Sequence, residues 1–329
     1  MDLTKENYYD VKMLSVSSVK QFAQNPARAL ADYKNEYPWF KKAIALPLGS
    51  AMHDMLECAI DYVKDKKNLN ASFQENADNW QSVLSKKAEE SAINLVLDEM
   101  YHSDFYASVR KKNGSLVVAA EQIPELFSII WNSEDIQLAV LKAMVGASLD
   151  RYDVIAEEPF IGLYVENNKS IKFKGKPDLF VVDHQAKTID AYDYKTSKPF
   201  DSSGYEWGTD IYGKRAYMPV EWEVQKLFPW QAGVYRELLR QNGYQDYHIS
   251  YKYLVVTKEK TPRFNIFKIS DESMDEGYEQ FCSWLVRAYG YISGDLEAPL
   301  VQDGSEFANL KSHKKPIEFE SHPYYSDAD

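Results

Sequence analysis

The sequence lacks several features that define common classes of protein. It contains two cysteines, Cys58 and Cys282, which excludes a disulfide framework, a four-thiolate zinc site and a four-cysteine iron–sulfur cluster. No uninterrupted apolar run reaches about 18 residues, the length that a membrane-spanning helix needs. Residues 1–7 lack the basic-then-apolar pattern of a secretion signal. We therefore expect a soluble protein of the reducing cytoplasm with no membrane partner.

An excess of positive charge is also missing. Of the 329 residues, 50 are acidic and 38 are basic, and the formal net charge at pH 7 is −12. This balance argues against a protein that coats nucleic acid or an anionic membrane through its overall charge. It leaves room for an enzyme that holds nucleic acid in a local basic groove.

The pattern of apolar residues changes near residue 150. Residues 1–150 show mostly helical spacing, and residues 151–300 alternate short strand-like runs with helical ones. Residues 301–329 form a polar tail. The sequence therefore predicts a helical N-terminal part packed on an α/β core, in which the strand-like runs between residues 160 and 195 form an antiparallel meander. Residues 200–220 are expected to be irregular.

The core contains a dense group of charged residues, Gly175-Lys176-Pro177-Asp178 and, after fourteen intervening residues, Asp193-Tyr194-Lys195-Thr196. Asp178 is expected to open one strand and Asp193 to lie near the end of its antiparallel neighbour, so both carboxylates share one end of a hairpin. Asp193 and Lys195 are two residues apart and face the same side. Two carboxylates can hold Mg²⁺ and leave positions for phosphate and water. Lys195 could position or deprotonate the attacking water.

These residues resemble the signature of PD-(D/E)XK nucleases. Gln231-Ala232-Gly233-Val234-Tyr235 is similar to the Q-x-x-x-Y motif of the RecB-like branch. Two N-terminal blocks match the same branch: Leu14-Ser15-Val16-Ser17-Ser18 with Asn25-Pro26, and Gly49-Ser50-Ala51-Met52-His53. The order and spacing are most similar to RecE-like (exodeoxyribonuclease VIII-like) phage and prophage exonucleases. The resemblance implies a restriction-endonuclease-like fold, a mixed central β-sheet flanked by helices, with a helical N-terminal elaboration.

The resemblance also implies a role for each motif residue. Asp178 would be the central metal-bridging carboxylate, Asp193 the second metal ligand and Lys195 the catalytic lysine. His53 would complete the metal site. The implied metal is Mg²⁺, with Mn²⁺ as a substitute.

Three further residues are site candidates. Glu158, or its neighbour Glu157, stands where related nucleases often carry an acidic metal ligand, although either could be a simple edge charge. Gln231 and Tyr235 are four residues apart and share a helix face, from which they could contact phosphate or orient the lysine. The alternative for this pair is an ordinary packing face.

Basic residues are concentrated in the core despite the acidic total. Seven lysines and four aspartates lie between residues 169 and 198. Three of these lysines share a strand face and are expected to follow a DNA backbone, unless the face is merely solvated: Lys172, Lys174 and Lys176. An aromatic loop at 205–222 carries Lys214 and Arg215 and could stack unpaired bases or simply pack on the core.

The predicted function is a metal-dependent DNA exonuclease, and the resemblance implies that it degrades linear double-stranded DNA from 5′ to 3′ in phage-type homologous recombination. By resemblance, its partners would be a single-strand annealing protein and further copies of the chain in a ring. The same core also serves structure-specific or restriction-type endonucleases. A non-catalytic DNA-binding subunit is a third interpretation, against which the intact Asp178, Asp193 and Lys195 argue.

Overall fold

The computed structural model of the chain describes residues 3–34, 45–149, 151–166, 169–197, 205–209, 215–219 and 221–299. These residues fall into two compact units. One unit comprises Met1–Val16 and Lys41–Cys282, and the other comprises Ser17–Phe40 and Ser283–Asp329. The predicted polar tail, residues 301–329, lies outside the described residues.

A five-stranded mixed sheet forms the centre of the larger unit, in the order β10-β9-β6-β5-β2. Strands β6 and β9 pair in parallel, and the other neighbours are antiparallel. The apolar runs form strands because both faces of the sheet are covered, and every residue of β5 is buried. The strands are β2 (Tyr152–Ala156), β5 (Leu179–Asp183), β6 (Thr188–Ser197), β9 (His248–Thr257) and β10 (Phe264–Ile269).

A second sheet has the order β1-β4-β3, in which β1 (Leu14–Ser15) runs parallel to β4 (Lys169–Gly175) and β3 (Phe160–Glu166) antiparallel to it. The predicted single meander is therefore wrong, because the chain leaves one sheet after Gly175 and enters the other at Leu179. The expected irregular segment also contains a hairpin, β7 (Tyr205–Thr209) and β8 (Arg215–Pro219).

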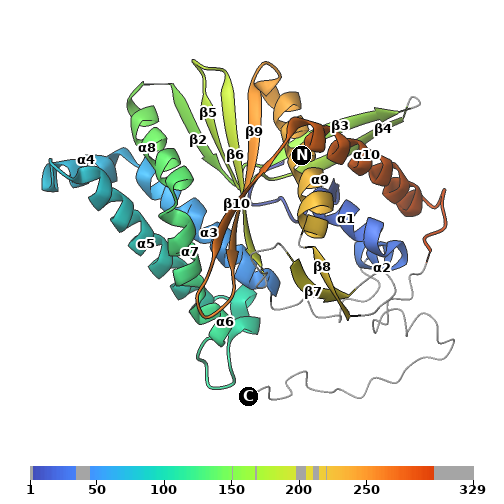
Figure 1. The fold of residues 1–329 in the computed structure, drawn as a ribbon, viewed down its shortest axis with the longest axis horizontal. Helices are drawn as coiled ribbons and strands as arrows, with labels where there is room; N and C mark the ends of the chain where they lie inside the picture. The colour runs from blue at the N-terminus through green and yellow to red at the C-terminus, as the bar shows by residue number, and fades with distance from the viewer. Residues whose placement is uncertain are drawn as a thin grey trace. The chain divides into compact units, whose positions relative to one another are not determined.

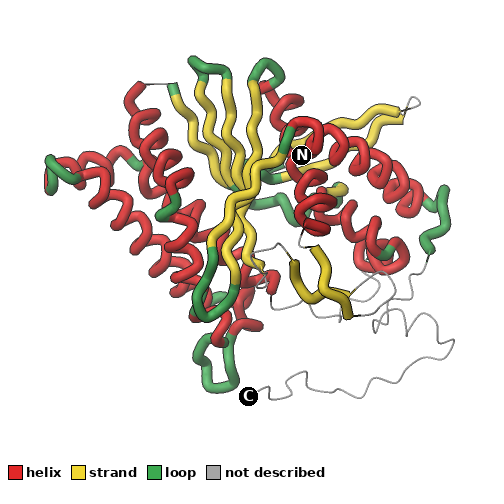
Figure 2. The backbone as a smooth tube through the Cα atoms, viewed as in Figure 1, coloured by secondary structure: helices red, strands yellow, loops and turns green. Residues whose placement is uncertain are grey.

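Helices cover both faces of the central sheet (Figures 1 and 2). On one face, the N-terminal helices share a single core with side chains from β2, β5, β6 and β9. They are α3 (Ala45–Lys64), α4 (Lys66–Glu75), α5 (Trp80–His102), α6 (Val118–Glu121), α7 (Ile123–Trp131) and α8 (Glu134–Leu149), with a 3₁₀ turn at Asp104–Val109. The predicted mixed sheet flanked by helices, with a mostly helical N-terminal part, is confirmed.

Helix α9 (Glu221–Leu239) covers the opposite face and contains Pro229, as the sequence predicts (Figure 1). A π-helical turn at Arg240–Tyr244 follows it, and Gly243 has a φ of 107°. Helix α10 (Asp271–Ser293) crosses α9 closely, because a Cβ atom on Gly277 would lie 2.2 Å from the carbonyl oxygen of Pro229.

The smaller unit contains most of α1 (Val16–Gln24), α2 (Pro26–Tyr33) and the end of α10. Asn25 caps α2 through its side chain, and the rings of Phe22 and Tyr291 stack with centroids 6.2 Å apart. In the described part of the chain, none of the helices has the length and hydropathy of a membrane span.

Candidate active site

The β5–β6 hairpin brings two aspartates to the same end of the central sheet. Leu179 is the register partner of Tyr192, so Asp178 immediately precedes the pairing and Asp193 immediately follows it. Both side chains are buried. The backbone N–H of Tyr194 donates to Asp178 Oδ2 at 2.8 Å, which fixes the carboxylate of Asp178 against β6. The juxtaposition expected from the sequence is present.

Helix α3 adds His53 to this end of the hairpin. Its Nδ1 lies 3.0 Å from Glu157 Oε1 and 3.3 Å from Asp178 Oδ1. One nitrogen or oxygen atom from each of these three residues lies within 4.8 Å of the others. The ring of Tyr194 meets the imidazole edge-on, at a centroid distance of 6.0 Å. His53, Glu157 and Asp178 thus form a compact group of two buried carboxylates and a half-buried imidazole.

Glu157, rather than Glu158, belongs to this group. Strand β2 ends at Ala156, and Glu157 adopts a left-handed backbone with a φ of 56°. Its N–H donates to the carbonyl oxygen of Asp178 at 3.1 Å, and this bond holds the unusual conformation in place. Glu158 is exposed. Of the two alternatives left open by the sequence, Glu157 is the one that joins the group, because the backbone reversal turns it inward.

Asp193 lies outside that group and has its own set of partners. Its carboxylate pairs with the ammonium of Lys195 and accepts a hydrogen bond from the side-chain amide of Gln231 on α9. The hydroxyl of Tyr251 donates to Asp193 Oδ2 at 3.4 Å. Lys195 and Gln231 therefore meet at one carboxylate. The role of Asp193 as a metal ligand stays a prediction.

Burial and crowded charges shift the pKa values of this end of the hairpin. Burial, and then the neighbouring Asp193, raise the pKa of Asp178 to about 7. Burial acts to lower the pKa of His53, but Asp178 and Glu157 outweigh it and raise that pKa to about 9. Burial likewise opposes the charge of Lys195, yet Asp193 and Asp178 raise its pKa above the usual value. The site therefore favours positive charge.

The donor atoms of the group suit a divalent metal ion. Two buried carboxylates and one imidazole are hard or borderline ligands, and one donor atom of each lies within 4.8 Å of the others. The pKa of Asp178 is raised first by burial and then by the neighbouring negative charge of Asp193. A cation of charge +2 would balance this negative charge.

Tyr235 serves to pack the core at this site. Its ring lies against Tyr251, with centroids 6.3 Å apart, and against the backbone of Gly175. A Cβ atom on Gly175 would lie 2.8 Å from the Tyr235 ring, so a larger residue would displace it. The close approach explains glycine at the start of the Gly175–Asp178 motif. A phosphate contact by Tyr235 stays a prediction.

The three strand lysines have different environments. Lys172 is exposed. Lys174 is 5% exposed, and its ammonium donates to the backbone carbonyls of Tyr8 and Val11, so it holds the N-terminal segment in place of a DNA backbone. Lys176 pairs with Glu157. The prediction of one continuous basic face is therefore wrong for Lys174.

The remaining basic candidates are described only in part. Lys214 lies outside the described residues, and Arg215 begins β8.

Sequence reasoning missed the role of Lys176 as the partner of Glu157. Its position two residues before Asp178, inside the recognised motif, was the available signal.

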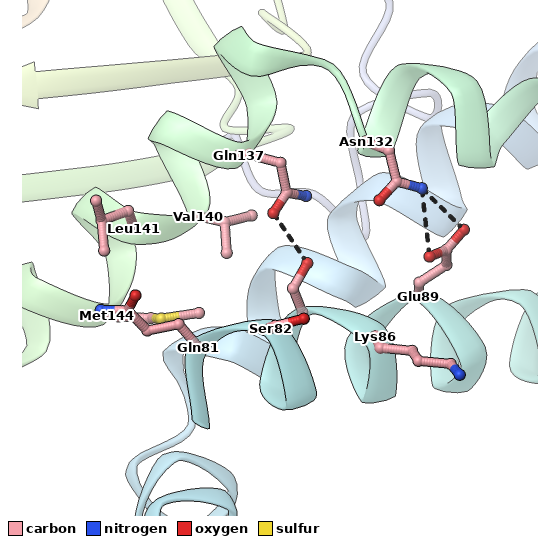
Figure 3. Close-up of a pocket in the computed structure, with 10 residues that line it drawn as sticks. Gln81, Ser82, Lys86, Glu89, Asn132, Gln137, Val140, Leu141 and Met144 are labelled. Carbon is pink, nitrogen blue, oxygen red and sulfur yellow. Dashed lines mark hydrogen bonds between the residues drawn. The ribbon is translucent and has the colours of Figure 1, made fainter. Parts of the chain in front are cut away.

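A separate pocket of about 490 Å³ lies between helices α5 and α8 (Figure 3). The Ser85 hydroxyl donates to Gln137 at 3.1 Å, and the Asn132 amide donates to Glu89 at 3.4 Å, so its polar side chains largely satisfy one another. It contains none of the predicted site residues: its lining is Gln81, Ser82, Ser85, Lys86, Glu89, Asn132, Gln137, Val140, Leu141 and Met144.

Comparison with protein families places this arrangement in a known group. The model of the PD-(D/E)XK nuclease superfamily matches residues 13–310, which include the whole hairpin and α3. The chain belongs to the PD-(D/E)XK nuclease superfamily. Its mixed sheet with flanking helices is accordingly a restriction-endonuclease-like fold, as the sequence predicted. No curated protein matches the sequence.

Solved structures give a consistent result for the fold. A protein from Eubacterium rectale, described as a "putative exonuclease", superimposes with a TM-score of 0.59 over 96% of both chains, at 18% sequence identity. A second structure, SSO0001, gives a TM-score of 0.28 at 13% identity, over 58% of this chain and 76% of that one, which is too low to carry an argument. The family model establishes the nuclease superfamily, and the RecE-like branch stays a prediction.

Proposed function

We propose that the protein is a metal-dependent exonuclease that hydrolyses phosphodiester bonds of linear double-stranded DNA. The observation that carries the proposal is the convergence of His53, Glu157 and Asp178 beside the Asp193–Lys195 pair, at one buried end of a hairpin. A purely structural role explains this set poorly, because burying several charged side chains together costs desolvation energy that apolar packing would avoid. Membership of a nuclease superfamily supports the same chemistry.

His53, Glu157 and Asp178 would hold the metal ion, with Asp193 as a further ligand. Mg²⁺, or Mn²⁺ in its place, would polarise the scissile phosphate and lower the pKa of a bound water. The chain itself contributes a fixed ammonium: Lys195 is anchored by Asp193, which Gln231 holds from the other side.

Lys195 can donate hydrogen bonds to the attacking water and to a non-bridging phosphate oxygen. Water forms a new bond to phosphorus while one phosphorus–oxygen ester bond breaks, and the leaving oxygen takes up a proton. Negative charge grows on the phosphate oxygens as this happens, so a pre-positioned ammonium stabilises the transition state more than the ground state.

The resemblance to RecE-like exonucleases supports the finer parts of the proposal. They are digestion from 5′ to 3′, a role in phage-type homologous recombination, an annealing protein as partner and a ring of identical chains. An endonuclease with the same core is the alternative enzyme, and a non-catalytic DNA-binding subunit is the alternative without catalysis.

The test compares linear duplex DNA, labelled at either the 5′ or the 3′ end, with covalently closed circular DNA. In Mg²⁺ we expect the 5′ label to be released first in short products while the 3′ label stays on a shortening strand, and the circle to stay intact. EDTA should stop the reaction. Cutting of the circle would favour the endonuclease, and no digestion in Mg²⁺ or Mn²⁺ would favour the non-catalytic subunit.

A further inference from the structure

An exposed aromatic ring lies beside the proposed metal site. Tyr9 is 80% exposed, whereas its neighbour Tyr8 is buried. The two rings meet edge to face, with centroids 5.3 Å apart and planes at 89°. Isolated exposed aromatic residues are common on protein surfaces, so exposure alone assigns no role to Tyr9. A role is indicated by the contacts that hold its segment and by its position near the proposed metal ligands.

The segment that carries Tyr9 is fixed to the nuclease core at several points. Buried Lys174 on β4 donates to the carbonyl of Val11 at 2.8 Å and to that of Tyr8, and its ammonium lies 4.3 Å from the centroid of the Tyr8 ring. Leu14 pairs with Phe173 in the β1–β4 ladder. The backbone segment that carries the Tyr9 ring is therefore held against the nuclease core.

One side chain separates this ring from the proposed metal ligands. The ammonium of Lys176 lies 5.7 Å from the ring centroids of both Tyr8 and Tyr9. The same ammonium pairs with Glu157, whose carboxylate contacts His53. A DNA strand whose phosphate reaches the metal group would thus have a neighbouring nucleotide within reach of Tyr9.

We propose that Tyr9 stacks on an unpaired base of the DNA strand that enters the site, a role that rests on the proposed nuclease function. Every nucleobase has an aromatic face, so stacking holds a strand without sequence preference. An enzyme that digests from an end meets each sequence in turn, and it needs a contact of this kind. The Lys176 ammonium beside the ring adds an attraction for the phosphate backbone.

The test is a double-mutant cycle in binding. The probe is a fluorescein-labelled duplex with a single-stranded 5′ tail, whose tail carries either normal bases or abasic sites, and its dissociation constant is measured by anisotropy in EDTA. We expect Tyr9→Ala to weaken binding of the normal tail by about 5- to 100-fold, as loss of one base–aromatic stack does. Tyr9→Trp should retain binding. On the abasic tail, Tyr9→Ala should bind like the wild type.

Equal binding of the normal tail by Tyr9→Ala and the wild type would overturn the stacking role, and so would an equal loss on both tails. Tyr101→Ala removes a tyrosine of α5 that is 45% exposed and serves as the matched control. It should bind both tails like the wild type, and a loss equal to that of Tyr9→Ala would also overturn the assignment.

The wild type is assayed for hydrolysis of the same duplex in Mg²⁺, which separates the two proposals. Hydrolysis by the wild type together with unchanged binding by Tyr9→Ala would refute the stacking role alone. A wild type that neither binds nor hydrolyses the DNA would refute the nuclease proposal, and the stacking role with it.

Discussion

Each end of the β5–β6 hairpin carries a buried aspartate, and the pKa values of these two aspartates are shifted in opposite directions. At one end the pKa of Asp178 is raised to about 7, and at the other end the pKa of Asp183 is lowered to about 2. The two residues begin and end one short buried stretch of chain, so sequence neighbourhood does not explain the difference. The groups that contact each carboxylate explain the difference between the two pKa values.

At the far end the carboxylate of Asp183 is supplied with donors. Arg151 contributes Nε at 3.2 Å and Nη2 at 2.8 Å, and the backbone N–H groups of Gln185 and Ala186 each donate at 3.0 Å. These contacts close the turn between β5 and β6. A carboxylate with this many donors stabilises the fold and has no need of a metal ion.

At the near end, three buried carboxylates lie close together and share the charged side chains that pair with them. Asp178, Asp193 and Glu157 are all buried, and the Tyr194 N–H is an amide donor to Asp178. The positive side chains there, His53, Lys176 and Lys195, are shared among the three carboxylates. The comparison contrasts one carboxylate that accepts four hydrogen bonds of its own with three carboxylates that share their positive partners, which is the arrangement expected of the proposed metal site.

The largest expected effect is on catalysis at the near end. Lys195→Ala should lower the rate of DNA hydrolysis by at least about 10³-fold, because the fixed ammonium beside the phosphate is lost. Lys187→Ala, just before the opposite end of the same strand, is the matched control and should keep the wild-type rate. Release of acid-soluble nucleotides from linear duplex DNA in Mg²⁺ measures both. Comparable rates for the two variants would remove Lys195 from the mechanism.

The next largest effect is on stability at the far end. Asp183→Ala should lower the free energy of unfolding at pH 7 by about 2 kcal/mol, from the difference between the lowered pKa and the usual value of Asp. Because the pKa is lower in the folded state, this contribution is complete above about pH 4 and disappears as the pH falls toward 2. Urea unfolding at pH 7, 4 and 3 measures it.

His184→Ala serves as the control for Asp183→Ala, since His184 lies in the same turn and its ion pair with Asp153 is solvent-exposed. An exposed pair of this kind contributes little, and a change under about 0.5 kcal/mol is expected at pH 7. A pH-independent loss in Asp183→Ala would contradict the role of the charged carboxylate.

The smallest effect is a gain of stability at the near end. Asp178→Asn should raise the free energy of unfolding by about 1 kcal/mol at pH 8 in EDTA, because the gain from removing a buried charge exceeds the loss of its contact with His53. Since the pKa of Asp178 is raised on folding, its ionisation costs stability above about pH 4, and the cost is complete above about pH 7. The gain should therefore vanish at pH 4. A variant less stable than the wild type at pH 8 would break the contrast between the two ends.

The fold was largely predictable because strong periodic patterns and the order of the motifs carry it. The strands around Asp178 and Asp193, and the bent helix with Gln231, were read from local sequence. The allocation of β4 and β5 to different sheets was not predictable, since strand pairing depends on contacts far apart in the sequence. The two-residue strand β1, from the N-terminal segment, pairs with β4 in place of β5.

The errors within the site have similar causes. Glu157 turns inward through a left-handed φ that glutamate rarely adopts, and no local signal marks it. Lys174 and Lys172 share a strand face by alternation, but the N-terminal segment covers Lys174 and leaves Lys172 exposed. A role for Tyr9 could not be predicted from the sequence, because its ring lies beside Lys176, which is distant along the chain.

The most direct test of the account is Mn²⁺ binding to the wild type and to two adjacent variants, measured by calorimetry. Glu157→Gln should weaken the site by at least about 10-fold, because it removes a charged ligand from the buried group. Glu158→Gln, one residue further along and exposed, should bind Mn²⁺ like the wild type. Weakened binding in Glu158→Gln with wild-type binding in Glu157→Gln would contradict the assignment of the metal site.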